Sequence, residues 1–491
     1  MTTRNKYTAL SGGLDLISPP IEMNPERALL ALNYELDANG KFVSLEGYSQ
    51  IGGSTLAGSG DVLGLEVYKG ELYGIREDAG AAKLYKNNAG TWSEIAPAAG
   101  TMPIGPYELD TATFKALANA QVMMMQCRNS GKPWQYDGTT LSELTNAPAG
   151  GRFLKEHSNH LFIGFEAGSV QFSALGDPSD WQTANGAGEF GVSDSLTGFA
   201  PLKKALAIAC EKSVQILYGT ISADFQREYH SGTGVISGTT QSLGGSALFL
   251  AEAGLSSLDT IDDFGDFALG NWGERVKPLL DLTATPTCSA ILKRKNQYWL
   301  FYSDGTALIC RWYGGATWGI TTAKLPVVVK AACSGVVAGQ EEMFIGTDQG
   351  DVFQMNSGTS FNGADIQTTL AVAYNHLGNP DIRKRFRRVF LDIQAESTVQ
   401  ISALPQFDYG DNEIARHLVL FKDALAQGGQ WGISNWSEFA WGSPIVDRFK
   451  IDTIGTATAI NFIINTKSAL AKPHRIAGYS THFSARRLKR G

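Results

Sequence analysis

The stretch 156–160, EHSNH, has residue types that could bind a metal. It places His157 and His160 next to Glu156, and two imidazoles with a carboxylate form a possible ligand set. The alternative is a hairpin turn at Ser158-Asn159 flanked by two strand histidines. We favour the hairpin, because the helical metal motif places its two histidines at i,i+4, whereas these are three residues apart in a stretch with the pattern of strand and turn.

A second motif matches a nucleotide-binding string. Gly186, Gly188 and Gly191 in NGAGEFG fit G-x-G-x-x-G, but the string neither follows a strand of a βαβ unit nor opens a helix. Without a helix N-terminus there is no dipole to hold a pyrophosphate. The phosphate loop G-x-x-x-x-G-K-[ST] and the hydrolase elbow G-x-S-x-G do not occur in the sequence. The sequence therefore predicts no cofactor, no metal and no catalytic residue.

Carboxylates could support an enzymatic alternative. Asp262, Asp263 and Asp266 lie close together, and the segment 407–413 reads FDYGDNE. A glycosidase needs two such groups opposed across a groove at a fixed separation, which a sequence does not reveal. Acidic loops on an acidic domain are usually solvated surface, so we predict that the protein is not an enzyme.

Two clusters near the C-terminus are typical of interfaces. A basic run surrounds Phe386 ahead of a predicted strand: Arg383, Lys384, Arg385, Arg387 and Arg388. It could contact phosphate, form a subunit interface, or protect an edge strand from mispairing; we favour the interface. A tryptophan-rich loop adds Trp431, Trp436 and Trp441, and aromatic residues are enriched at interface hot spots, although carbohydrate stacking stays open.

Charge divides the chain into two parts. Residues 381–491 carry 16 Lys and Arg against 10 Asp and Glu, a net +6, whereas residues 1–380 carry 25 against 38, a net −13. An acidic body disfavours a surface that grips nucleic acid, since phosphate binding requires clustered Lys and Arg. It suits a surface that DNA slides past.

Cysteine usage and hydropathy indicate a chain made in a reducing cytoplasm, without a membrane anchor. The cysteines are odd in number and widely spaced, without a C-x-x-C pair: Cys127, Cys210, Cys288, Cys310 and Cys333. The start MTTRNKYTAL has no apolar core of a signal peptide, and no run of 18 apolar residues occurs.

The elements expected to position these residues are almost all strands. One short N-terminal helix is predicted over 24–36, with Asn24 as cap, Pro25 at the first position and Leu29, Leu32 and Leu36 on one face. From about residue 60 to 360, clusters of short strands recur every forty to fifty residues, which is the length of a four-stranded propeller blade. We predict an all-β fold: an arm over 1–59, a β-propeller of about six degenerate blades over 60–360, and a C-terminal β-sandwich over 361–491.

The segment FSALGDPSDW, residues 172–181, predicts a fixed turn. Asp177 and Pro178 start the turn, and Trp181 can fold its ring back over the corner. We interpret these three residues as a structural lock on one blade loop.

Short motifs at the start, middle and end resemble tail nozzle proteins of short-tailed bacteriophages, also called tail tubular or packaged-DNA stabilisation proteins. The start has GGLDL and the match at Asn33, Tyr34, Glu35, Gly47 and Tyr48; the middle has Ser173, Gly176, Asp177, Pro178 and Trp181; the end reads KPHRIAGYSTHFSARR. Related propeller proteins of longer-tailed phages share these motifs.

The resemblance implies a structural protein of the virion tail, assembled in the host cytoplasm. It implies a homohexameric ring below the portal and its adaptor, the head-to-tail connector ring, with tail fibre or needle proteins as further partners. Packaged DNA would be retained in the lumen and conducted through it at ejection, without sequence-specific binding. The alternative is a receptor-binding or glycan-degrading propeller of a phage tail.

Overall fold

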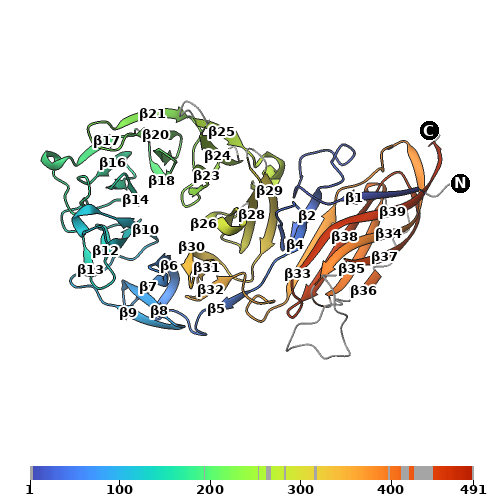
Figure 1. Cartoon of the computed structure of the whole chain (residues 1–491), viewed down its shortest axis with the longest axis horizontal. Helices are drawn as coiled ribbons and strands as arrows, with labels where there is room; N and C mark the ends of the chain where they lie inside the picture. The colour runs from blue at the N-terminus through green and yellow to red at the C-terminus, as the bar shows by residue number, and fades with distance from the viewer. Residues whose placement is uncertain are drawn as a thin grey trace.

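The chain forms a ring of β-sheets joined side by side to a β-sandwich, and both termini lie in the sandwich part (Figure 1). The computed structural model describes residues 4–192, 194–252, 254–260, 267–280, 284–314, 318–395, 397, 399–410, 420–424 and 446–488. The predicted all-β fold, a propeller with a β-sandwich, is confirmed.

Six blades are separate four-stranded antiparallel sheets. They comprise β6 (Ser59–Tyr68), β7 (Glu71–Asp78), β8 (Ala81–Asn88) and β9 (Thr91–Ile95); β10 (Tyr107–Thr113), β11 (Gln121–Cys127), β12 (Trp134–Tyr136) and β13 (Leu141–Glu143); β14 (Phe153–His157), β15 (His160–Gly164), β16 (Ser169–Phe172) and β17 (Gly188–Gly191); β18 (Leu196–Pro201), β19 (Ala205–Cys210), β20 (Val214–Tyr218) and β21 (Gln226–Ser231); β22 (Gln241–Leu243), β23 (Ser246–Ala251), β24 (Gly254–Thr260) and β25 (Phe267–Asn271); and β30 (Val329–Val337), β31 (Gln340–Thr347), β32 (Val352–Met355) and β5 (Tyr48–Gln50).

A further four-stranded unit completes the ring at its junction with the sandwich: β26 (Pro286–Leu292), β27 (Gln297–Tyr302), β28 (Thr306–Trp312) and β29 (Trp318–Lys324). The first strands of successive units contact one another in a closed circle, from β6 through β10, β14, β18, β22 and β26 to β30 and back to β6. The N-terminal strand β5 pairs with β32 as the outer strand of the last blade, so an early and a late part of the chain together close the ring.

Apolar side chains fill the space between neighbouring blades. Met123 and Met125 of β11 pack with Ile75 and Leu84 of the preceding blade, and equivalent buried clusters lie at the other blade junctions. Each fully buried side chain of this size contributes about 1.5–3 kcal/mol relative to exposure. Because a single blade buries its two faces only against its neighbours, the ring stabilises itself by closing.

The sandwich consists of two sheets. One contains β1 (Arg4–Ala9), β3 (Tyr34–Leu36), β4 (Phe42–Ser44), β34 (Ile382–Ala395), β37 (Val446–Ala457) and β39 (His474–Leu488). The other contains β2 (Ala28–Leu32), β33 (Ile366–Val372), β35 (Val399–Phe407), β36 (Leu420–Ala424) and β38 (Ile460–Ser468). Strand β2 pairs with both β29 and β33, so this second sheet continues into the propeller as one nine-stranded sheet.

The predicted helix over 24–36 is wrong. Asn24 starts a tight turn, in which its side-chain oxygen accepts a bond from the Glu26 N–H, and strands β2 and β3 follow. The leucine spacing suited a helix, but Asn33 has φ 57° and interrupts the segment, and pairing with β29 and β33 outweighs the local preference. The α-helix in the described residues is the short α1 (Lys277–Leu280), and the remaining helical turns are 3₁₀: η1 (Lys115–Leu117), η2 (Thr183–Asn185), η3 (Glu274–Val276), η4 (Lys293–Lys295) and η5 (Asp408–Gly410).

The N-terminal residues predicted as an arm contribute strands to both bodies. β1, β3 and β4 lie in the sandwich, β2 lies in the sheet that joins the two bodies, and β5 lies in a blade. The arm therefore connects the two bodies.

Candidate functional site

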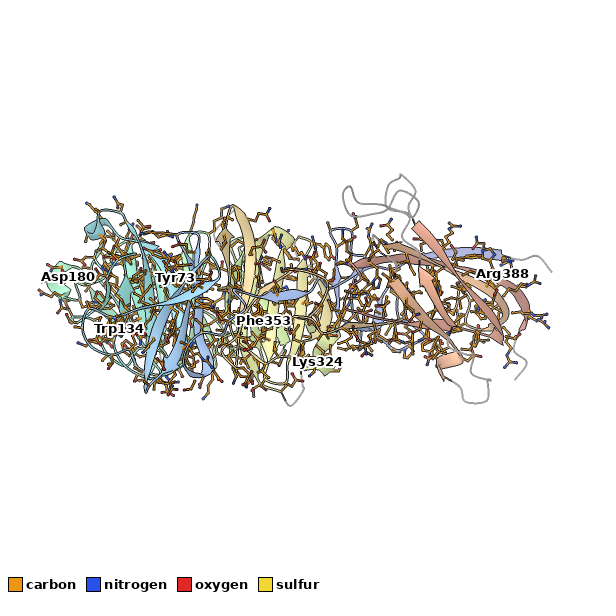
Figure 2. All side chains as sticks on the ribbon, turned by 90° about the horizontal axis from the view of Figure 1, so that it is seen from below. Tyr73, Trp134, Asp180, Lys324, Phe353 and Arg388 are labelled. Atoms are coloured by element: carbon orange, nitrogen blue, oxygen red, sulfur yellow. The ribbon has the colours of Figure 1, made fainter. Side chains whose placement is uncertain are left out.

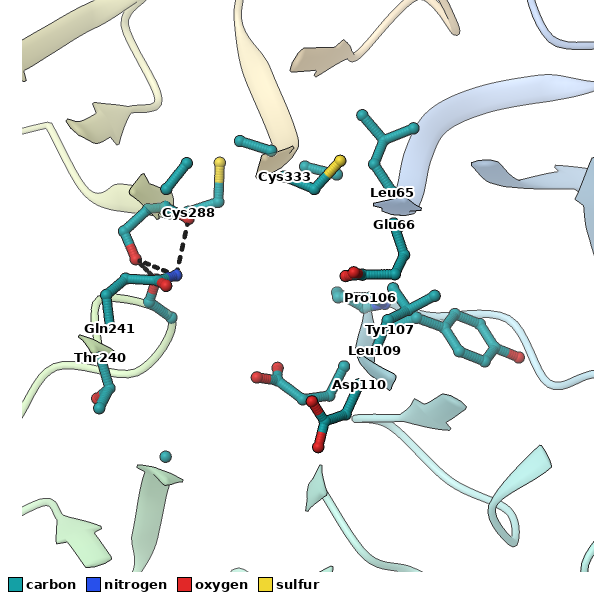
Figure 3. Close-up of a pocket in the computed structure, with 18 of the residues that line it drawn as sticks. Leu65, Glu66, Pro106, Tyr107, Leu109, Asp110, Thr240, Gln241, Cys288 and Cys333 are labelled. Atoms are coloured by element: carbon teal, nitrogen blue, oxygen red, sulfur yellow. Dashed lines mark hydrogen bonds between the residues drawn. The ribbon is translucent and has the colours of Figure 1, made fainter. Parts of the chain in front are cut away.

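The inner strands of the blades surround a central cavity of about 630 Å³. Polar and charged side chains dominate its wall, and Figure 3 shows Glu66 pointing into it, with Asp110 on a neighbouring strand and Gln241 and Cys288 across the gap. This volume is that of a small-molecule pocket.

Most charges in the cavity are paired with an opposite charge. The Arg128 Nε donates to Glu108 at 2.9 Å, and the Lys155 Nζ donates to Asp110 at 2.6 Å. Lys330 lies 3.1 Å from Asp61. The Lys155–Asp110 and Lys330–Asp61 pairs each join strands of neighbouring blades and fix these blades against each other, whereas the Arg128–Glu108 pair lies within the second blade.

The carboxyl of Glu66 in this wall has no such partner, because no ion pair or side-chain hydrogen bond to it is found in the described part of the chain. Burial, with the nearby carboxylate of Asp110 adding to it, raises the pKa of Glu66 to about 8. The carboxyl is therefore largely protonated at neutral pH. The sequence analysis missed this group; its signal is a glutamate inside the otherwise apolar strand VLGLEVY.

Two thiols lie in the same wall, and neither is activated. Burial raises the pKa of Cys288 to about 12 and the pKa of Cys333 well above its ordinary value. Since the thiolate is the nucleophile, both are unreactive near neutral pH. Among the residues that the structure describes, no group of three or more His, Cys, Asp or Glu side chains is arranged to hold a metal ion.

The histidine pair forms the hairpin that we favoured. His157 ends β14, His160 starts β15, and the two face each other across a turn in which Ser158 and Asn159 both have positive φ. The His160 Nδ1 lies 2.6 Å from the Ser173 carbonyl oxygen, and burial lowers the pKa of both histidines. The glycine string is likewise structural, since Gly186 ends η2 and Gly188 and Gly191 bound strand β17.

The turn at 172–181 is fixed by its own side chains. The Trp181 Nε1 donates to the Pro178 carbonyl at 2.9 Å, and Asp177 accepts bonds from both the backbone N–H and the hydroxyl of Ser179. The half-buried Trp181 ring packs on the apolar cluster between the second and third blades, which includes Phe114. The indole ring of Trp181 and its hydrogen bond together hold this loop against the blade junction.

The residues of the N-terminal motif lie at the junction between propeller and sandwich. The Asn33 Nδ2 donates to the Gln367 carbonyl of β33 at 2.7 Å, while its Oδ1 accepts from the Lys324 N–H of β29 at 2.8 Å. Glu35 accepts bonds from Lys295 and Gln297, both at 2.8 Å, on the propeller side.

Tyr34 extends the same junction into the sandwich. Its hydroxyl lies 3.0 Å from the His474 Nε2 and accepts a bond from Thr368 at 3.1 Å, all buried. Burial raises the pKa of Tyr34 above its usual range and lowers the pKa of His474 to about 4. This network is therefore neutral at physiological pH and links β3, β33 and β39.

The last two motif residues close the ring. Tyr48 of β5 stacks on Phe361 with ring centroids 5.1 Å apart, and a Cβ added to Gly47 would lie 2.1 Å from the Ser360 carbonyl oxygen. The N-terminal motif thus supplies both the junction and the ring closure.

The basic run lies on β34, a strand hydrogen-bonded on both sides, by β39 and β37. The reading of this run as a protected edge strand is therefore wrong. Lys384 is buried, and its Nζ donates to the carbonyl oxygens of Asn379, Ile382 and Thr458 at 2.6–3.0 Å. The arginines are exposed: Arg383, Arg385, Arg387 and Arg388.

Several predicted site residues lie outside the described residues: Trp431, Trp436 and Trp441, and the carboxylates Asp262, Asp263 and Asp266. Of the segment 407–413, the structure describes residues up to Gly410. Their roles stay predictions.

Comparisons with known proteins show no family for this chain. No protein-family model and no curated protein sequence matches the chain. Similar solved structures include the WD40 repeats of RRP9, at 11% identity and a TM-score of 0.46 over 64% of this chain and 99% of that one. U3-55K has 11% identity and a TM-score of 0.44 over 62% of this chain and 97% of that one. Raptor from Chaetomium thermophilum has 6% identity and a TM-score of 0.42 over 65% of this chain and 29% of that one. Among the described residues, no helix has the length and apolar character to cross a membrane.

Proposed function

We propose that this chain is a structural virion protein, the tail nozzle subunit of a short-tailed bacteriophage. Copies of it form a ring-shaped channel, a homohexamer below the portal and its adaptor ring, which retains packaged DNA and conducts it at ejection. One observation carries the proposal: the short motifs shared with nozzle proteins coincide with the contacts that fix the shape of the molecule. Asn33 joins propeller to sandwich, Tyr48 closes the ring, and Trp181 fixes a blade loop.

Charge and cavity size support the same role. The acidic body, net −13 over residues 1–380, suits a lumen that repels the phosphate backbone and lets DNA slide. Because the central cavity of one copy has a volume of about 630 Å³, the conduit for DNA would form in the assembled ring. Adaptor ring and tail fibre or needle proteins are the partners that such a ring requires at its two ends.

A glycan-degrading propeller is the second candidate. The observation that favours it is the presence of Glu66, Glu108 and Asp110 in one cavity, since glycosidases use paired carboxyls. Two of the three already bind Arg128 and Lys155, which leaves Glu66 without a free carboxylate partner. We therefore place this candidate second.

The experiment is native mass spectrometry of the purified chain, alone and after addition of the adaptor ring from the same phage. A six-copy assembly on the adaptor supports the nozzle. A chain that stays monomeric with the adaptor and releases sugars from host polysaccharide supports the second candidate and overturns the first.

A further inference from the structure

One face of the sandwich presents a dense group of positive charges, which we name the basic face. Its members are the outward side chains of β34 and β37: Arg383, Arg385, Arg387, Arg388, Arg448 and Lys450. The opposite sides of these strands hold Phe386, Val389 and Ile451 in the core. The strands thus direct apolar residues inward and the basic residues outward.

The basic face is only partly neutralised. Asp452 lies 2.9 Å from Lys450 and 3.8 Å from Arg388, and Asp392 lies 3.4 Å from Arg448. By contrast, Arg383, Arg385 and Arg387 form no ion pair within the described part of the chain. Six cations and two carboxylates leave this face with a net charge of +4.

Aromatic side chains lie among these charges. Phe390 of β34 contacts the His482 ring, with centroids 5.2 Å apart, and Tyr7 of β1, which pairs with β39, is 52% exposed. A charged face with exposed aromatic rings has the composition of a protein interface, where aromatics and arginine are enriched.

A segment that covers most of the third blade and the first strand of the fourth, β18, has the opposite character. Residues 156–202 contain six acidic residues and no Lys or Arg: Glu156, Glu166, Asp177, Asp180, Glu189 and Asp194. We name this segment the acidic blade. Asp177, Asp180 and Glu189 form no ion pair within the described residues, and Leu175 beside them is 53% exposed.

These two surfaces lie at opposite ends of the molecule. Figure 2 shows Asp180 at one end of the long axis and Arg388 at the other, and Figure 1 places β16 and β17 on the side of the ring away from the sandwich. Within one copy they therefore lie too far apart to meet. Two copies arranged head to tail would bring them together.

We propose that the basic face of one copy docks on the acidic blade of the next, as the contact that builds the ring. The inference rests on the proposed function and specifies its subunit interface. Such a heterologous contact closes into a ring when its rotation permits and otherwise forms a filament. The occupant is a second copy and not nucleic acid, because Asp392 and Asp452 interrupt the basic face, whereas a nucleic-acid footprint clusters positive charge.

The test is a charge-reversal cycle followed by native mass spectrometry with the adaptor ring. Arg385→Glu with Arg387→Glu should raise the concentration for half-assembly at least tenfold. The matched control is Arg275→Glu with Lys277→Glu, two exposed cations of η3 and α1 that belong to neither surface. It changes the net charge equally and should assemble as the unaltered chain does. Circular dichroism and melting curves establish that each variant is folded.

Reversing the charges on both surfaces provides the decisive test. Asp180→Arg with Glu189→Arg should also weaken assembly, and the chain carrying all four changes should recover it, since each contact then has opposite charges again. Two results would overturn the docking contact without contradicting the ring itself. In the first, the Arg385/Arg387 variant assembles at the same concentration as the unaltered chain. In the second, the chain with all four changes does not recover assembly. An unaltered chain that never assembles overturns the proposed function itself. Binding of duplex DNA that is lost in the Arg385/Arg387 variant would assign the face to nucleic acid and overturn the docking too.

Discussion

Trp181 closes the turn that its own sequence starts. Its indole N–H donates to the Pro178 carbonyl, and its ring covers apolar residues at the junction of two blades. Most of this was predictable from the spacing D-P-x-x-W, because proline fixes the corner and a ring three residues later can reach back. The blade junction on which the ring packs involves residues such as Phe114, which are distant in sequence and could not be predicted.

Trp181→Ala should destabilise this loop by about 2–3 kcal/mol, somewhat less than the loss for a fully buried tryptophan. Limited proteolysis within 175–186 should become faster, and the melting temperature should fall. Trp181→Phe is the control, since it keeps most of the packing and loses only the hydrogen bond, at about 1 kcal/mol. Equal proteolysis rates for the Ala variant and the unaltered chain would mean that the ring does not hold the loop.

Glu66 makes stability depend on pH. Its folded pKa of about 8 exceeds its unfolded value, so the folded state binds the extra proton between these two values. Its contribution is fully present below the unfolded pKa and is lost as pH rises through about 8. In Glu66→Gln this loss should vanish, so the variant should be more stable than the unaltered chain at pH 9 and differ less at pH 5. Urea unfolding at pH 5 and pH 9 measures the free energy of unfolding of both chains. A stability difference between them that is the same at both pH values would contradict the raised pKa of Glu66.

At the scale of elements, the junction strand β2–β3 shows where sequence patterns fail. Turns and strand clusters of the propeller were predictable, because Gly, Asn and Asp mark each turn locally. The helix predicted over 24–36 was wrong, since the partners of this segment, β29 and β33, come more than 280 residues later. The nine-stranded sheet that joins the two bodies depends on the same distant pairing.

Asn33 tests how this junction is held. Its side chain bonds both β29 and β33, and its φ of 57° is one that alanine adopts poorly. Asn33→Gly removes both bonds and should cost about 2 kcal/mol, whereas Asn33→Ala adds about 1 kcal/mol of backbone strain. Calorimetry should therefore give the order unaltered chain, Gly, Ala in falling melting temperature. A higher melting temperature for Asn33→Ala than for Asn33→Gly would show that the left-handed backbone at this position does not affect stability.

At the scale of the whole molecule, the division of charge was visible in the sequence, and its placement was not. The counts predicted an acidic body and a basic C-terminal part. Only the fold shows that Arg385 and its neighbours share one open face, and that Asp180 lies at the opposite end of the molecule from Arg388. The cavity group Glu66 was missed for a related reason, since the strands that surround it come from all parts of the ring.

The central claim is that this chain acts through the shape and charge of a ring around the path of the genome. Cryo-electron microscopy of the intact particle of the phage that encodes it tests this claim most directly. The account predicts six copies around the exit path, directly below the adaptor ring, with a basic face against an acidic blade at each contact. Density for the chain at a fibre tip, or a particle that lacks the chain, would contradict it.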